Sequence, residues 1–209
     1  FCGGHTHALA RYGIEDLLPK NIEMIHGPGC PVCVLSAGRI DAAIRLAKQD
    51  NIVICAYGDL MRAPGSRGNS LLRARASGAD IRMIYSPLDA LKIAMDYPDK
   101  EIVFFAIGFE TTTPPTALAV QIAQRDRIKN FSVFCNHVLT PAAMRHILTE
   151  SQSLASQRLT IDGIVGPAHV SAVIGCKPYQ EIAKNFTKPI VIAGFETLDI
   201  LQALLMLLR

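Results

Sequence analysis

Residues 101–107 read EIVFFAI, and residues 108–115 continue the chain as GFETTTPP. The first run is continuously apolar rather than alternating, which is typical of a strand buried on both faces of a parallel sheet. The second run is typical of a helix start, because threonine can cap the first turn and proline fits its first position. This stretch therefore predicts a buried strand that passes directly into a helix.

The same pattern recurs along the chain. Short apolar runs of the strand type occupy residues 21–25, 51–57, 80–85, 131–134, 161–165 and 188–193. Helical patterns lie between and after them, at 37–49, 87–97, 115–128, 141–151, 171–184 and 197–208. This alternation predicts an α/β architecture whose parallel strands are joined by right-handed crossovers. The polar stretch DYPDK at 96–100 predicts a boundary between a domain at 1–99 and a domain at 100–209.

Composition narrows the class of protein. The chain has 209 residues, and its 50% hydrophobic and 19% charged residues exclude a disordered chain. A net charge of +3 is too small to indicate nucleic-acid binding, and no glycine loop matches a phosphate or dinucleotide motif. The arginines of the loop-like stretch 61–78 could hold a phosphate or an acidic partner, or could simply be solvated.

Neither a membrane segment nor a signal peptide is visible in the sequence. The most apolar stretch, residues 190–208, is interrupted by Glu196, Asp199 and Gln202. Residue 1 is Phe rather than Met, and the final apolar helical pattern has no capping residue. We therefore expect a piece of a longer protein, with residues missing at both ends.

Three candidate metal ligands open the chain in the stretch FCGGHTH. Cys2, His5 and His7 are ordinary ligands for a borderline-soft metal, and the two intervening glycines let the backbone approach a bound group. The alternative is a buried cysteine with two structural histidines at a helix start.

A second cysteine motif follows in HGPGCPVC, residues 26–33. Cys30 and Cys33 form a CxxC pair on backbone stiffened by proline, which suits either two metal ligands or a reversible dithiol. In a chain of this length the pair indicates intracellular metal or redox chemistry rather than a disulfide framework. A structural zinc held by Cys2, one nearby histidine and this pair is a third interpretation. The cysteines at 55 and 135 are typical of core packing, and Cys176 has no partner in sequence.

Polar residues gather just after the predicted strands. Ligands of open α/β sheets bind beyond the carboxyl ends of the strands, so Glu110, His137 and His169 fall where a site is expected. Each histidine alone is more typical of a structural role, and Glu110 could be a base, a ligand or an ion-pair partner. The threonines at 111–113 suit a helix cap and a functional role equally. IGFETT at 107–112 and AGFETL at 193–198 also echo each other.

Taken together, these motifs resemble the HypD family of hydrogenase maturation (formation) proteins. The match runs in order through CGGHTH, HGPGCPVC, GDLMRAPGS, YSPLDALKIA, FFAIGFETTTP, NHVLTP, GPAHVS and GFETLDILQ. The resemblance implies two parallel-sheet α/β units facing a central cleft. It also implies a cytoplasmic assembly scaffold with thiol redox function, rather than a stand-alone enzyme, that helps to build the Fe(CN)2CO unit of [NiFe] hydrogenases. The implied partners are a HypC-like small chaperone and a HypE-like cyanide donor, with no nucleic acid and no membrane.

The resemblance also implies residue roles. Cys2 becomes the iron-binding thiolate with His5 assisting it, and Cys30 with Cys33 becomes the redox pair. We group Glu110 with the catalytic residues, and expect Thr111, Thr112 and His169 to hydrogen-bond the iron-bound cyanide. The family also carries a [4Fe–4S] cluster held by cysteines of a C-terminal region, and the motif for it does not occur up to Arg209.

Two other functions remain open from sequence. A thioredoxin-like dithiol oxidoreductase would need Cys30 and Cys33 but neither Cys2 nor iron. A zinc-stabilised binding module would hold zinc one-to-one and would unfold when the metal is chelated.

Overall fold

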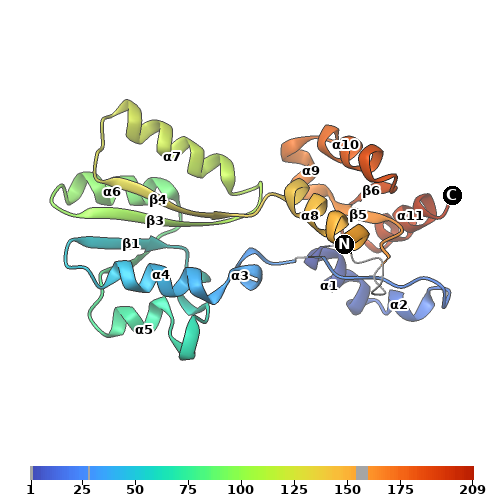
Figure 1. Ribbon diagram of the computed structural model, residues 1–209, viewed down its shortest axis with the longest axis horizontal. Coiled ribbons are helices and arrows are strands. Elements are labelled where there is room, and N and C mark those ends of the chain that lie inside the picture. The colour runs from blue at the N-terminus through green and yellow to red at the C-terminus, as the bar shows by residue number, and fades with distance from the viewer. Residues whose placement is uncertain (1, 28, 154–159) are drawn as a thin grey trace. The chain divides into compact units, whose positions relative to one another are not determined.

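The computed structural model of the chain describes residues 2–27, 29–153 and 160–209 (Figure 1). The chain divides into two compact units. One is continuous, Pro31–His137, and the other combines Phe1–Cys30 with Val138–Arg209.

The continuous unit is built on a parallel sheet of four strands in the order β2-β1-β3-β4. Its strands are β1 (Ile52–Ala56), β2 (Ile81–Met83), β3 (Glu101–Gly108) and β4 (Phe131–His137). Its helices are α3 (Pro31–Val34), α4 (Ala37–Ala47), α5 (Leu71–Ala76), α6 (Pro87–Asp96) and α7 (Thr113–Arg125), with short 3-10 turns at Leu60–Arg62 and Ser66–Gly68. The apolar stretch at 101–107 is the interior strand β3, which pairs with β1 on one side and β4 on the other.

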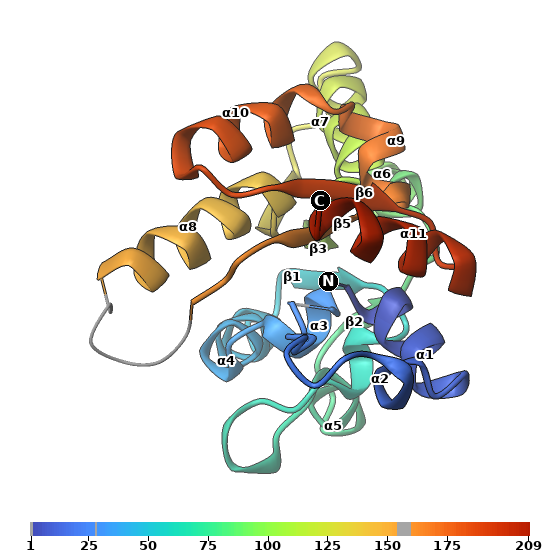
Figure 2. The same cartoon turned by 90° about the vertical axis from the view of Figure 1, so that its right-hand side faces the viewer.

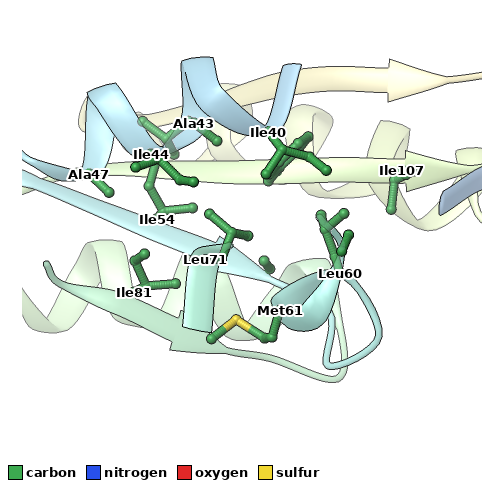
Figure 3. Close-up of a cluster of buried hydrophobic side chains, with 14 residues drawn as sticks. Ile40, Ala43, Ile44, Ala47, Ile54, Leu60, Met61, Leu71, Ile81 and Ile107 are labelled. Carbon is green, nitrogen blue, oxygen red and sulfur yellow. The ribbon is translucent and has the colours of Figure 1, made fainter. Parts of the chain in front are cut away.

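Both faces of this sheet are covered, which explains its continuous apolar runs. Figure 1 shows α4 and α5 on one side of the sheet and α6 and α7 on the other. Ile54 lies with Ala43 and Ile44 of α4 and Leu71 of α5 in one buried cluster (Figure 3). Phe105 belongs to the same cluster. Their chain neighbours Val53 and Phe104 point to the opposite cluster, under α6. Successive side chains of one strand therefore enter two separate cores, and both must be apolar.

The discontinuous unit holds a two-stranded parallel sheet of β5 (Ile164–Pro167) and β6 (Ile190–Ala193). Its helices are α1 (Gly3–Arg11), α2 (Ile14–Leu17), α8 (Thr140–Ser153), α9 (Ala168–Ile174), α10 (Lys177–Phe186) and α11 (Thr197–Leu207). Helix α11 packs along β6 (Figure 2). Leu9 of α1 and Ile14 of α2 share one buried cluster with Val165 of β5 and Ile200 of α11. This cluster fixes the first residues of the chain to the carboxyl-terminal half.

The structure confirms the mixed α/β class and the parallel strands, and it differs from the sequence predictions at several places. Residues 21–25 form no strand. The helical pattern at 171–184 is two helices, because Gly175 adopts φ +73° and ends α9. The division predicted at 99 and 100 does not coincide with the compact units, because β3 pairs with β1 across it. None of the helices in the described parts of the chain reaches the length and apolar character that a membrane span requires.

Candidate functional site

Cys2 lies at the amino end of α1, as the residue that caps the helix. Its backbone is extended, and its sulfur accepts a hydrogen bond from the amide of His5 in a capping-box arrangement. Serine, threonine or aspartate usually fills this position. A thiol placed here meets amide groups and the positive end of a nine-residue helix, both of which favour the thiolate over the thiol.

His5 lies one turn further along and is fully buried. Its Nε2 is 2.9 Å from the carbonyl oxygen of Gly194 and 3.2 Å from that of Ala193, at the end of β6. Because carbonyl oxygens only accept hydrogen bonds, Nε2 carries the proton. The neutral ring therefore presents an unprotonated Nδ1 toward Cys2, whose amide donates to it over 3.4 Å.

The two side chains shift each other's protonation. Burial alone would raise the pKa of Cys2, but hydrogen bonds from the side chain and amide of His5, with its charge, hold that pKa below its ordinary value. Burial alone would lower the pKa of His5, but the bond to Cys2, the thiolate charge and the two carbonyls raise it. Both shifts favour a thiolate beside an imidazolium, with the thiol proton moved to Nδ1.

Two glycine loops meet beside this pair. A Cβ atom added to Gly29 would lie 3.1 Å from the Cα and N atoms of Gly3, so the two backbones are in contact. The Thr6 hydroxyl, 2.8 Å from His26 Nδ1, gives a second link between α1 and the loop. The contact brings the loop that carries Cys30 alongside the residue after Cys2. Cys30 is half-buried, and Pro28 lies outside the described residues.

The ring of Phe195 lies next to the same pair. Its centroid is 4.9 Å from that of His5 and 5.3 Å from that of His169. His169 is an exposed residue of α9. The structure thus brings together Cys2, His5, the Cys30 loop and His169 within one unit.

The other predicted site residues belong to the continuous unit. Cys33 is exposed on α3, and the boundary between the two units falls within the CxxC motif, after Cys30. Glu110 is 4% exposed in the turn between β3 and α7, whereas Thr111 is exposed. The Thr112 hydroxyl lies 3.1 Å from the Phe109 carbonyl and 3.4 Å from that of Ile107, to which it donates.

The HypD family, described as "Hydrogenase formation hypA family", matches residues 1–209. This chain belongs to the HypD family.

Its HypD relatives are similar over the whole chain. The hydrogenase maturation factor HypD2 of Bradyrhizobium diazoefficiens is 65% identical over 209 residues, which cover 100% of this chain and 55% of the relative. HypD of Rhizobium leguminosarum bv. viciae is 64% identical, and HypD of Escherichia coli is 48% identical over 208 residues, with 54% of each relative covered. The chain therefore spans about half the length of these curated HypD relatives.

The remaining cysteines of this HypD chain do not suit an iron–sulfur cluster, which needs four thiolates at one place. Cys55 is buried in β1, and burial raises its pKa to about 12, which keeps it a thiol. Cys135 is exposed on β4, and Cys176 is exposed in the other unit. Among the residues that the structure describes, no three Cys, His, Asp or Glu side chains gather as a metal site.

The sequence did not predict two sets of side-chain contacts at the carboxyl edge of the four-stranded sheet. His137 places Nδ1 3.3 Å from the Gly108 carbonyl and Nε2 3.0 Å from the Thr116 hydroxyl. Arg39 reaches from α4 to the Asn136 side chain and stacks 4.1 Å over the Phe134 ring. His137 is thus used in the fold, which agrees with the structural role that the sequence favoured for it.

Proposed function

We propose that this HypD-family chain serves hydrogenase maturation as an assembly scaffold that holds iron on the Cys2 sulfur. The observation that carries the proposal is the Cys2–His5 pair at the start of α1. A cysteine needs a thiolate to bind iron, and this one combines amide donors, a helix amino end and a buried imidazole that can take its proton. Iron with its cyanide and carbonyl ligands is the cargo here, and the protein supplies one sulfur ligand.

His5 has a defined task in this scheme. Its Nε2–H is committed to the carbonyls of Ala193 and Gly194, so only Nδ1 can accept the proton that Cys2 loses when iron binds, and Nδ1 then gives up its 3.4 Å bond from the Cys2 amide. The proton stays within the pair, and the ring stays in place because both carbonyls belong to the end of a strand. His5 therefore assists the ligand and does not itself need to bind the metal.

Cys30 and Cys33 suit the redox part of the proposal. Oxidation of their two thiols to one disulfide releases two electrons and two protons, and the reverse step takes them up. The Gly3–Gly29 contact holds the Cys30 loop beside the iron ligand. We also propose that Glu110, whose carboxyl group is buried, takes part in this thiol redox chemistry. In this proposal the scaffold works in the cytoplasm, with a HypC-like chaperone and a HypE-like cyanide donor.

The hydrogen-bond donors for cyanide can be ranked. A hydroxyl has one proton, and the Thr112 hydroxyl directs its proton at carbonyls of its own turn. Thr111 is exposed and is therefore the better donor of the two threonines, and His169 is a further exposed residue expected for this role. Thr111→Val is therefore expected to weaken retention of the iron unit more than Thr112→Val. Equal losses, or a larger loss for Thr112→Val, would contradict this ranking.

Iron retention tests the scaffold directly. The protein is purified anaerobically with its small partner, and bound iron and zinc are measured for the parent and Cys2→Ser. Cys176→Ser is the matched control, since Cys176 is another helix-capping cysteine of the same unit. Iron lost only in Cys2→Ser supports the proposal. Zinc bound one-to-one would favour the binding module instead, and dithiol turnover without metal would favour the oxidoreductase.

A further inference from the structure

Phe195 occupies a central position that the proposed function leaves unexplained. It follows directly after Ala193 and Gly194, whose carbonyls hold the Nε2 end of His5. Its own ring packs against the His5 imidazole at a tilt of 41° and a centroid separation of 4.9 Å. This separation is within the range of favourable aromatic pairs. One short segment therefore contacts both the edge and the side of the histidine ring.

Helix α1 is shaped to receive this ring. A Cβ atom added to Gly4 would lie 2.6 and 2.7 Å from two carbons of the Phe195 ring. Real side chains do not approach so closely, so only glycine at position 4 lets the ring lie here. Gly4 is the residue before His5, and the second glycine of the opening motif thus has a packing reason.

We propose that Phe195 is a positioning residue for the Cys2–His5 pair, whose ring holds the His5 imidazole so that Nδ1 stays directed at Cys2. The two carbonyls fix only the Nε2 edge of the imidazole, and the ring could still tilt about that edge. Phe195 packs against one side of the imidazole and so limits this tilt. The importance of this position for iron rests on the proposed function, whereas the positioning itself does not.

The same ring reaches the second histidine of the site. His169 packs against Phe195 at 5.3 Å and a tilt of 41°. Phe195 is half-buried between a buried histidine and an exposed one. A single aromatic ring therefore contacts both imidazoles.

Two independent substitutions disturb the ring, and each has a matched control. Phe195→Ala removes the ring. Gly4→Ala displaces the ring by steric contact and leaves residue 195 as phenylalanine. Phe195→Tyr keeps the ring and should behave like the parent. Gly38→Ala places the same substitution at the same second helical position of α4, where an added Cβ meets nothing within 4 Å.

The measurement is nitrogen-15 NMR of the histidine side chains in the metal-free protein, with His5 assigned from a His5→Gln spectrum. In the parent the buried Nε2 proton of His5 should exchange slowly with solvent. In Phe195→Ala and in Gly4→Ala its exchange should be about tenfold faster or more, as expected for local opening. Phe195→Tyr and Gly38→Ala should retain the slow exchange.

The outcomes separate positioning from general packing. Faster His5 exchange, with the protected backbone amides of α1 and β6 unchanged, supports the proposal. Unchanged His5 exchange in Phe195→Ala would overturn it, and so would acceleration shared equally by the backbone amides. Because no iron is present, a failure here is distinct from a failure of iron binding by Cys2. If iron does bind, Phe195→Ala should also retain less of it than Phe195→Tyr.

Discussion

At the scale of single residues, the chemistry depends on which proton lies where. Cys2 and His5 are three positions apart in sequence, and the sequence alone predicted a possible metal-binding cluster. It did not show that His5 is buried or that two strand-end carbonyls fix its Nε2 proton. Those partners lie 188 and 189 residues away along the chain, and no local pattern reveals them.

The Cys2 thiolate gives a pH-dependent prediction. Although burial opposes the shift, the hydrogen bonds from His5 and its charge hold the pKa of Cys2 below the ordinary value, so at a given pH a larger fraction of Cys2 than of an ordinary cysteine should be thiolate. In His5→Gln that pKa should rise. This rise lowers the thiolate fraction at a given pH and slows alkylation, although the greater nucleophilicity of the more basic sulfur offsets part of the slowing.

Peptide-resolved alkylation of Cys2 across pH 5–9 measures this effect. His7→Gln is the control, because His7 is exposed on the same helix. An unchanged Cys2 profile in His5→Gln would show that the helix end, rather than the imidazole, activates the thiol.

His137 gives a second prediction at the scale of single residues, which concerns the stability of the fold rather than the reactivity of a thiol. Burial lowers its pKa below the ordinary value, although its bond to the Gly108 carbonyl opposes the shift. The unfolded chain therefore binds this proton at a higher pH than the folded one does. The stability of the continuous unit should be fully present above the unfolded pKa of about 6.5 and should decrease as the pH falls below it.

Urea unfolding at pH 7.5 and pH 5.5 tests this dependence. The loss of unfolding free energy between the two values should be smaller in His137→Gln than in the parent. The same loss in both proteins would assign the pH dependence to other groups.

At the scale of elements, the turn from β3 into α7 in the continuous unit requires a glycine. Gly108 ends the strand with φ +139°, and a Cβ atom there would collide with the Thr112 side chain. The sequence predicted the strand and the helix of this stretch correctly. Thr112 occupies the capping position of α7, but its side chain makes no capping hydrogen bond to the helix. The sequence could not predict the positive φ, because GFETTT contains no turn signature that demands one.

Gly108→Ala should therefore destabilise the protein more than a positive-φ glycine in open space. Gly78 provides the comparison, since its φ is +98° and an added Cβ meets nothing within 4 Å. Gly78→Ala is expected to cost about 1–2 kcal/mol from backbone strain alone. Gly108→Ala should cost at least about 1 kcal/mol more because of the collision. Equal losses of unfolding free energy in urea would show that the Thr112 side chain moves aside freely.

Helix α1 shows the opposite case, a helix that forms where the local sequence disfavours one. Its opening glycines disfavour a helix, and the sequence patterns did not predict one at 3–11. The helix forms because Ala8 and Leu9 are buried in a cluster with β5, β6 and α11. Tertiary packing overrides propensity here, and the two glycines fit close contacts with Gly29 and Phe195.

At the scale of the whole molecule, the chain passes between its compact units at two places. Residues 31–137 form one unit, and the segments on either side of them form the other. The proline-containing stretch at 96–100 marked only the connection from α6 to β3. A discontinuous unit leaves no trace in local composition, because the contacts that define it join distant segments.

The fragment 31–137 should thus fold on its own, whereas 1–99 should not. The first contains all four strands of its sheet and both covering layers, and the second lacks β3 and β4. Circular dichroism with urea should give one cooperative transition for 31–137 and none for 1–99. A cooperative 1–99 fragment would instead support the boundary predicted near residue 99.

The central claim, iron held on the sulfur of Cys2, is tested most directly by infrared spectroscopy. The sample is the anaerobically purified protein with its small partner, beside Cys2→Ala and the control Cys176→Ala. We predict cyanide and carbonyl stretching bands in the parent and in Cys176→Ala, and their absence in Cys2→Ala. Bands that persist at full intensity without the Cys2 sulfur would contradict the account.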